Sequence, residues 1–200
     1  MNDYPTLVEQ RLRTTVPSSP PMRPPTFDSA DVSYLVEDTA VGRILLARNE
    51  SGALVASRYV ADDEAVDTVL DRLARAVSPR VLRRPGALDD ARRQLDDFLA
   101  GRRHDFDLVT DLVLATPFQR DVLGTLARTV GYGERETYGG LARAIDRPGA
   151  SRAVGAALGA NPLCIVVPCH RIVGSHGALT GYAGGVRAKE YLLALEQPAA

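Results

Sequence analysis

The residues best suited to chemistry are Cys169 and His170, which are adjacent and are followed by Arg171. A cysteine attacks as its thiolate, and basic neighbours favour that form by lowering a thiol pKa that is ordinarily near ~8.5. The apolar run 165–167, which has the pattern of a buried strand, precedes the pair, and the glycine-rich segment 174–185 follows it. This combination indicates a nucleophilic cysteine. Taken alone, the pair is also consistent with an inert buried cysteine beside a hydrogen-bonded histidine, because adjacent strand residues point to opposite faces.

Length and composition describe an ordinary globular protein of 200 residues with a formal net charge of −1. No apolar run approaches the ~20 residues of a membrane span, and residues 1–25 lack the apolar core of a secretory signal, so a cytoplasmic location is expected. With Cys164 and Cys169 as its two cysteines, the chain is expected to hold reduced thiols and no disulfide framework. The cysteines and the three histidines are too scattered for a tetrahedral zinc site.

The elements that must position this pair fall into a leader and two modules. Residues 1–26 are rich in proline and polar side chains, which predicts an extended or disordered leader. The N-terminal module, 27–112, is predicted to be an α/β scaffold without catalytic residues. Alternating apolar residues predict an antiparallel meander, and apolar residues at helical spacing predict helices after it. The expected strands are 32–36, 43–48 and 53–60, and the expected helices are 62–77 and 89–100.

The C-terminal module, 113–197, begins with a clear helix start, because Thr116 can cap a helix whose first residue is Pro117. Two short helices, 137–145 and 150–159, follow on either side of a break that contains glycine. This pattern is typical of a helix-turn-helix.

The second of these helices has almost no bulky side chains and carries Arg152 in its first turn. Glycine inside a helix costs roughly 1 kcal/mol relative to alanine, so something is expected to approach this backbone closely. Tight packing on the core and entry into a narrow groove both satisfy that expectation. An arginine near a helix N-terminus opposes the helix dipole and favours an anionic partner. Residues 117–190 hold nine basic against five acidic residues, which suits phosphate contacts.

Taken in order, the motifs resemble those of the O6-alkylguanine-DNA alkyltransferases. The resemblance covers about 32–196 and rests on these segments: Thr116-Pro117-Phe118-Gln119, Thr137-Tyr138, Arg152-Ala153-Val154-Gly155, Asn161-Pro162, 165–172 and Gly181-Tyr182. It implies an α/β protein with a small N-terminal domain of ribonuclease-H-like fold and a mainly helical C-terminal domain with a winged helix-turn-helix.

The resemblance implies that Cys169 takes an alkyl group from O6 of guanine, irreversibly, in a single turnover and without a cofactor or metal. Glu190 matches a glutamate that orients His170, which in turn reaches the cysteine proton through a water molecule. Tyr138 matches a tyrosine that donates to guanine N3 as negative charge develops. Asn161 matches a hinge between the recognition helix and the active-site segment.

A stacked base must be rotated out of the duplex before it can react. The resemblance implies double-stranded DNA as the partner, bound through the minor groove, with Arg152 filling the gap and Ser151 and Ala153 beside the backbone. Tyr182, the carbonyl of Ile172 and the backbone amide of Ala183 are the expected contacts of the extruded base. A monomer in solution that can cluster on DNA is expected.

Three other functions remain as alternatives. A non-catalytic protein that binds alkylated DNA replaces the reactive cysteine and usually lacks the N-terminal module, whereas this chain has both. A thiol hydrolase needs its histidine to face the cysteine, which a sequential pair does not permit. A transcription regulator needs base-reading side chains, and the second helix offers few besides Arg152.

Overall fold

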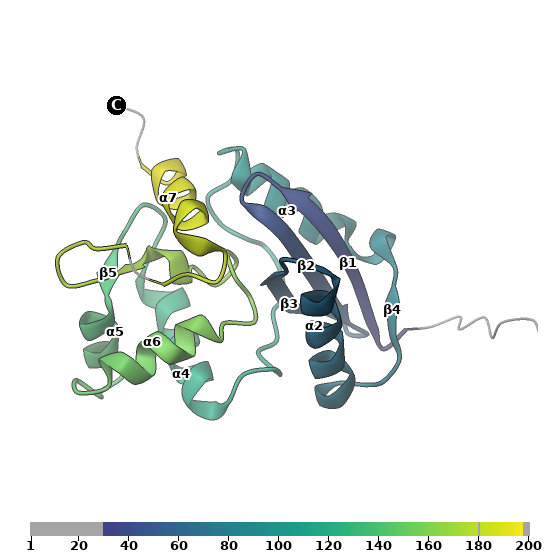
Figure 1. The fold of residues 1–200 in the computed structure, drawn as a ribbon, viewed down its shortest axis with the longest axis horizontal. Helices are drawn as coiled ribbons and strands as arrows, with labels where there is room; N and C mark the ends of the chain where they lie inside the picture. Colours follow the sequence, from purple (N-terminus) through teal and green to yellow (C-terminus); the bar gives the residue numbers. More distant parts are fainter. Residues whose placement is uncertain (1–29, 180, 198–200) are drawn as a thin grey trace, which may run out of the picture.

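The N-terminal half is built on a four-stranded sheet (Figure 1). The computed structural model describes residues 30–179 and 181–197, so the predicted leader, 1–26, lies outside the described residues. The strand order is β3-β2-β1-β4, in which β1 pairs antiparallel with β2, β2 antiparallel with β3, and β4 parallel with β1. The strands are β1 Val32–Thr39, β2 Gly42–Asn49, β3 Leu54–Tyr59 and β4 Val81–Arg83.

Side chains of the sheet alternate between two apolar clusters, as the pleat requires. On β2, Leu45 and Ala47 pack toward helix α2, Asp63–Ala76, whereas Ile44 and Leu46 pack toward helix α3, Asp89–Leu99. The 3-10 turn η1, Pro85–Leu88, leads into α3. The cluster between the sheet and α3 continues without interruption into the C-terminal half. The sheet is therefore covered on both faces.

The C-terminal half is mainly helical. Its elements are α4 Pro117–Thr129, α5 Tyr138–Ala144, α6 Ser151–Gly159 and α7 Gly185–Leu195, with the 3-10 turn η2, Cys169–Arg171, and the short parallel strands β5 Glu136–Thr137 and β6 Ile172–Val173. Thr116 caps α4 through a capping box with Gln119, and Pro117 is its first residue, as predicted. No helix within 30–179 and 181–197 is both long and apolar enough to cross a membrane.

Most of the predicted elements are present, with boundaries that differ by a few residues. The strand expected over 165–167 is wrong, because residues 165 and 166 form a turn. Ile165 has a φ of 73°, a left-handed conformation that a β-branched residue rarely adopts and that costs roughly 1–3 kcal/mol. Strands β4, β5 and β6 were not predicted, because two or three residues give no readable alternation.

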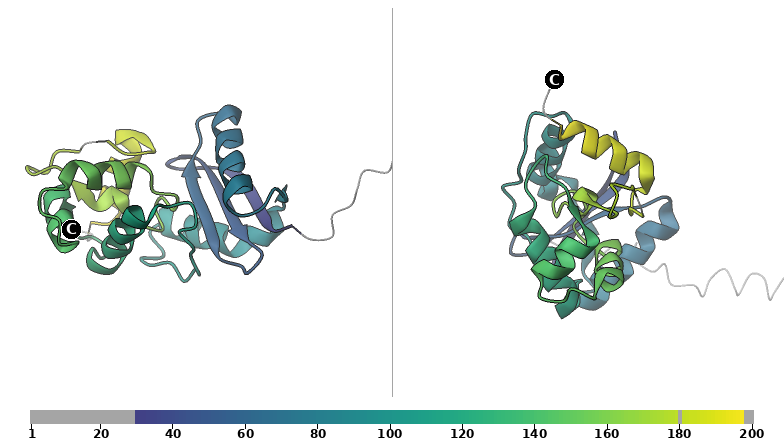
Figure 2. Two further views of the ribbon diagram at one scale, coloured as in Figure 1. Left: turned by 90° about the horizontal axis from the view of Figure 1, so that it is seen from below. Right: turned by 90° about the vertical axis from the view of Figure 1, so that its left-hand side faces the viewer.

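The two halves meet along the free edge of β3 (Figure 2). Leu54 donates to the carbonyl of Val109 and accepts from the amide of Asp111, so the connecting segment covers one end of the edge. Further along, Ser57 donates to the carbonyl of Pro162 and accepts from the amide of Cys164, both at 2.8 Å. The edge strand therefore pairs with the segment that leads to Cys169, which removes an exposed edge and ties the N-terminal sheet to the reactive residue.

Candidate active site

Cys169 is the first residue of η2 and is held by Asn161. The Asn161 side-chain amide donates to the sulfur of Cys169 at 3.1 Å and to the carbonyl of Val167 at 3.0 Å. Its oxygen accepts from the amide of Leu163 at 2.9 Å. Asn161 thus bridges the end of α6, the turn at Ile165 and the thiol, which are the contacts expected of a hinge. This side chain also compensates for the strained turn by satisfying its backbone groups.

The surroundings of Cys169 lower the pKa of its thiol. The largest cause is a hydrogen bond from the neighbouring Cys164 thiol; burial acts in the opposite direction, and the Asn161 amide and the positive charge of Lys189 lower the pKa further. The pKa of Cys164 is correspondingly raised, first because of its hydrogen bond to Cys169 and then because of burial. These opposite shifts favour ionisation of Cys169 over Cys164.

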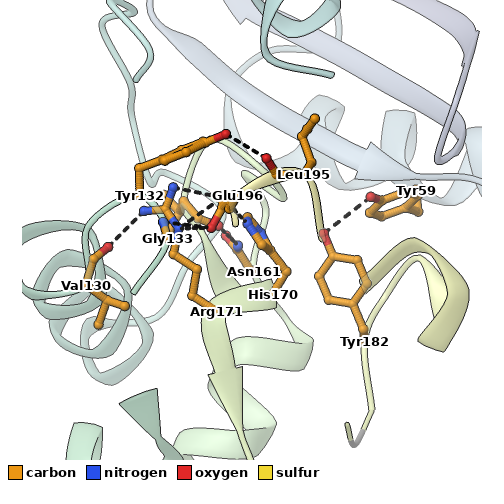
Figure 3. A network of polar contacts seen from close by, with 11 residues as sticks. Tyr59, Val130, Tyr132, Gly133, Asn161, His170, Arg171, Tyr182, Leu195 and Glu196 are labelled. Atoms are coloured by element: carbon orange, nitrogen blue, oxygen red, sulfur yellow. Dashed lines mark hydrogen bonds and ion pairs between the residues drawn. The ribbon is translucent and has the colours of Figure 1, made fainter. Parts of the chain in front are cut away.

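His170 is fully buried and binds Glu196, not Glu190 (Figure 3). The Nε2 atom of His170 lies 2.8 Å from Oε1 of Glu196. The prediction that Glu190 orients the histidine is wrong. Helix α7 buries Ala188, Lys189, Leu192 and Leu193, which leaves Glu190 on its exposed outer face. Glu196 is the C-cap residue of the same helix, and its side chain reaches His170 and Arg171 in η2.

Arg171 holds the same carboxylate. Its Nε donates to both oxygens of Glu196, at 3.1 and 3.0 Å, and its Nη1 donates to the carbonyl of Val130 at 2.8 Å. Burial alone raises the pKa of Glu196, but the hydrogen bonds and charges of His170 and Arg171 together outweigh it and lower that pKa. Glu196 is thus an ionised, buried carboxylate with its partners in place.

Burial lowers the pKa of His170 more than Glu196 raises it, so the imidazole is neutral near pH 7. A neutral imidazole facing a carboxylate donates from the near nitrogen, which assigns the proton to Nε2. The other nitrogen, Nδ1, is buried and has no hydrogen-bond partner within the described part of the chain. His170 therefore has an available lone pair beside Cys169 and can act as a base.

A cavity of about 440 Å³ opens over Cys169. It is lined by Tyr138, Gly155, Leu158, Gly159, Cys169, Gly181, Tyr182 and Ala183. The structure therefore brings together four residues predicted for the site, namely Cys169, Tyr138, Tyr182 and Ala183. Ile172 lies elsewhere: it is fully buried and does not line the cavity, and its carbonyl accepts a hydrogen bond from Lys189. If the Ile172 carbonyl contacted an extruded base as expected, it would have to accept hydrogen bonds from both the base and Lys189.

Helix α6 forms one side of the cavity and presents small residues to solvent. Gly155 and Gly159 line the cavity, while Arg152 and Ala153 are exposed and Ser151 is half-buried. Arg152 makes no ion pair with any of the residues that the structure describes. A cation at the start of an unhindered helix face, beside the mouth of a cavity, suits a polyanionic partner.

Sequence reasoning missed Glu196, Lys189 and Tyr59. The register of α7 gives a usable signal for Glu196, because the apolar positions place Glu190 outside. Lys189 is the single lysine of the chain and lies on the apolar face of that helix, an unusual place for a charged side chain. No local signal identifies Tyr59, whose contacts at the site, Tyr182 and Gly184, lie more than a hundred positions away in the chain. Within 30–179 and 181–197, no group of three or more histidine, cysteine, aspartate or glutamate residues is placed to hold a metal ion.

Comparisons with known proteins agree with this geometry. The model of the 6-O-methylguanine DNA methyltransferase DNA-binding domain matches residues 117–198. A methylated-DNA–protein-cysteine methyltransferase of Shigella flexneri is 51% identical over 109 residues, which are 54% of this chain and 61% of that relative. The chain thus spans about six-tenths of the length of that relative. A methylated-DNA–protein-cysteine methyltransferase of Methanosarcina acetivorans is 39% identical over 163 residues, 82% of this chain and 97% of the relative.

Solved structures show the same likeness. The crystal structure of Mycobacterium tuberculosis O6-methylguanine methyltransferase matches with a TM-score of 0.69 and 37% identity, over 84% of this chain and 96% of that chain. The structure of Mycobacterium tuberculosis OGT in complex with DNA matches with a TM-score of 0.69 and 38% identity, over 82% and 92%.

Proposed function

The chain belongs to the methylated-DNA–protein-cysteine methyltransferase family, and we propose that it repairs alkylated DNA directly by moving the alkyl group of O6-alkylguanine onto its own Cys169. The observation that carries the proposal is the placement of a thiol of lowered pKa at the base of a cavity, next to a buried histidine and carboxylate. The product is a thioether at Cys169, so each molecule reacts once.

The chemical step needs a thiolate and a leaving group that departs as a neutral base. In the proposed reaction, the lone pair of His170 Nδ1 takes the Cys169 proton through a water molecule, and Glu196 stabilises the resulting imidazolium. The sulfur attacks the alkyl carbon, the carbon–O6 bond breaks, and the electron pair returns to the guanine ring. Tyr138 lines the cavity and is proposed to donate its hydroxyl proton to guanine N3 as that charge develops, so that the guanine leaves as a neutral base. The proton held by the imidazolium then returns to the tyrosine through water, so that the Cys169 proton balances the one gained by the base. The amide of Ala183 is proposed to donate to O6. No cofactor enters this balance.

Double-stranded DNA is the proposed partner. The guanine has to leave the stack to reach a cavity of this kind. We assign α6 to the minor groove, which is only ~6 Å wide and admits a helix whose exposed side chains are small. Arg152 is proposed to occupy the gap left by the base, with Ser151 and Ala153 against the DNA backbone. We further propose that the protein is a monomer in the cytoplasm. Residues 27–112 are the proposed scaffold, and residues 113–197 are the proposed reactive domain. The proposal includes the clustering of several protein molecules along one DNA duplex.

Intact-protein mass spectrometry tests the proposal directly. Incubation with duplex DNA that carries O6-methylguanine should add one methylene, about 14 Da, to one residue, and peptide mapping should place it on Cys169. Cys169→Ser should gain no mass, whereas Cys164→Ser should still be methylated. Binding to the modified duplex without any gain of mass would instead identify a non-catalytic lesion-binding protein. Repeated turnover, or methylation at another residue, would overturn the mechanism.

A further inference from the structure

The last three residues of β3 each contact the reactive half of the molecule. Ser57 pairs through its backbone with the segment 162–164. The Arg58 guanidinium donates to the carbonyl of Asn161 at 2.9 Å. Tyr59 places its hydroxyl 3.3 Å from the hydroxyl of Tyr182, a wall residue of the cavity (Figure 3). The N-terminal sheet is thus in direct contact with the hinge and with the cavity wall.

Tyr59 packs closely against Tyr182 and against the backbone that follows it. The two rings meet edge to face with their centroids 5.5 Å apart, a favourable aromatic arrangement. A Cβ atom on Gly184 would lie 2.5 to 2.8 Å from three atoms of the Tyr59 ring, which is closer than any real contact. Gly184 has a φ of −85°, a value that every residue adopts, so it is the neighbouring tyrosine and not the backbone conformation that excludes a side chain there.

Tyr59 does not line the cavity; it contacts Tyr182, which does. Tyr182 stands between Tyr59 and the reaction centre: its ring centroid lies 6.3 Å from that of His170, and its side chain faces the cavity that contains Cys169. Burial raises the pKa of both tyrosines, so the pair remains uncharged beside a thiolate. The contact is therefore a neutral hydrogen bond and an aromatic packing contact, and it places the Tyr59 ring directly against Tyr182.

We propose that Tyr59 is a positioning residue that fixes Tyr182 and the backbone at Gly184, and that this support limits the size of the alkyl group the cavity admits. The inference rests on the proposed alkyl transfer and adds to it a determinant of substrate range. A hydrophobic pocket typically discriminates by roughly 10- to 200-fold against a group that it does not accommodate, and a movable wall gives up part of that discrimination. The N-terminal sheet would then set specificity without touching substrate.

The test compares two substrates in each variant. Single-turnover rate constants are measured with duplex DNA carrying O6-methylguanine or O6-benzylguanine. Tyr59→Ala is expected to raise the benzyl-to-methyl ratio by about tenfold, the lower end of pocket discrimination. Tyr59→Phe keeps the ring and should keep the ratio. Tyr34→Ala, which removes a partly buried tyrosine from the opposite region of the sheet, is the matched control and should also keep it. Partial unfolding slows both substrates equally, so the ratio reports the cavity alone.

A second pair of variants tests the contact itself. Gly184→Ala should slow methyl transfer, because the new Cβ displaces the chain from Tyr59, and adding Tyr59→Ala to it should restore most of the rate. An unchanged ratio in Tyr59→Ala, or a double variant as slow as Gly184→Ala, would overturn the inference. Transfer of neither alkyl group by the wild-type chain would instead refute the proposed function, so the two failures are distinguishable.

Discussion

The carboxylate of Glu196 binds His170 and Arg171 at the same time, with Oε1 2.8 Å from Nε2 of the histidine and 3.0 Å from Nη2 of the arginine. All three side chains are buried, with exposures of 2%, 0% and 7% for Glu196, His170 and Arg171. The arginine keeps the carboxylate ionised, and the ionised carboxylate fixes the proton of the histidine on Nε2. One residue at the end of α7 thereby fixes both the proton position and the orientation of the proposed base next to Cys169.

Replacement of Glu196 should greatly reduce stability and the rate of alkyl transfer, whereas replacement of Glu190 should change neither appreciably. Glu196→Gln leaves the buried guanidinium of Arg171 without its counter-charge, which typically costs about 3–5 kcal/mol. It also removes the acceptor that orients His170, so the rate of alkyl transfer should fall even under conditions where the variant is folded. Glu190→Gln changes an exposed side chain of the same helix and should alter the free energy of unfolding by less than about 0.5 kcal/mol. Urea denaturation and single-turnover kinetics on both variants check this. Equal effects of the two substitutions would contradict the assignment.

Acid should destabilise the protein in two steps. The pKa of His170 is lowered from 6.5 by burial, so the unfolded chain binds a proton there before the folded one, and stability decreases as the pH falls below about 6.5. The pKa of Glu196 is lowered from 4.5, because the hydrogen bonds and charges of His170 and Arg171 outweigh burial, so a further contribution is lost as the pH falls through that region. The free energy of unfolding measured from pH 8 to pH 2, a range that extends well below 4.5, should show both losses. His170→Gln should lack the first, and a profile identical to that of the wild type would exclude this origin.

The pH dependence of alkyl transfer should report the Cys164 thiol. The pKa of Cys169 is lowered from 9.0, first by the hydrogen bond from Cys164, so the rate should rise with pH as the thiolate forms, with its midpoint below pH 9. Cys164→Ala removes the donor and should move this profile to higher pH. Cys164→Ser keeps a donor of similar size and is the matched control. Rates of alkyl transfer from pH 6 to pH 10 measure the shift, and superimposable profiles for alanine and wild type would show that Cys164 only fills space.

Arg152 should matter for duplex DNA and not for the chemical step. Arg152→Ala is expected to slow transfer from an O6-methylguanine duplex by ten-fold or more, about the 1–3 kcal/mol that one good nucleic-acid contact contributes. Transfer from free O6-benzylguanine, which needs no base extrusion, should be unchanged. Arg75→Ala removes an exposed arginine from the far side of the N-terminal sheet and controls for net charge. An equal loss on both substrates would show that Arg152 does not act through the DNA.

The predicted site residues that the structure brings together are those encoded by short motifs. Cys169 with its neighbours, Asn161 before the turn, and Tyr138 at a helix start each sit in a local pattern, and the structure places them around one cavity or in contact with it. The prediction for Glu190 is wrong because the helical register of α7, and not the residue type, decides which glutamate faces His170. The prediction of a strand over 165–167 is wrong because three apolar residues are equally suited to a buried turn.

By itself, the sequence determined the local elements, the candidate nucleophile and the small-residue helix, because caps, apolar periodicity and motif spacing depend on neighbours within a few positions. The tertiary structure decided which carboxylate reaches His170, that the thiol of Cys164 lies next to Cys169 and lowers its pKa, and that Tyr59 contacts Tyr182 across 123 positions of the chain. These relationships depend on how the free edge of β3 and the end of α7 pack against η2. Packing of that kind joins residues that share no local pattern, so only the folded chain reveals it.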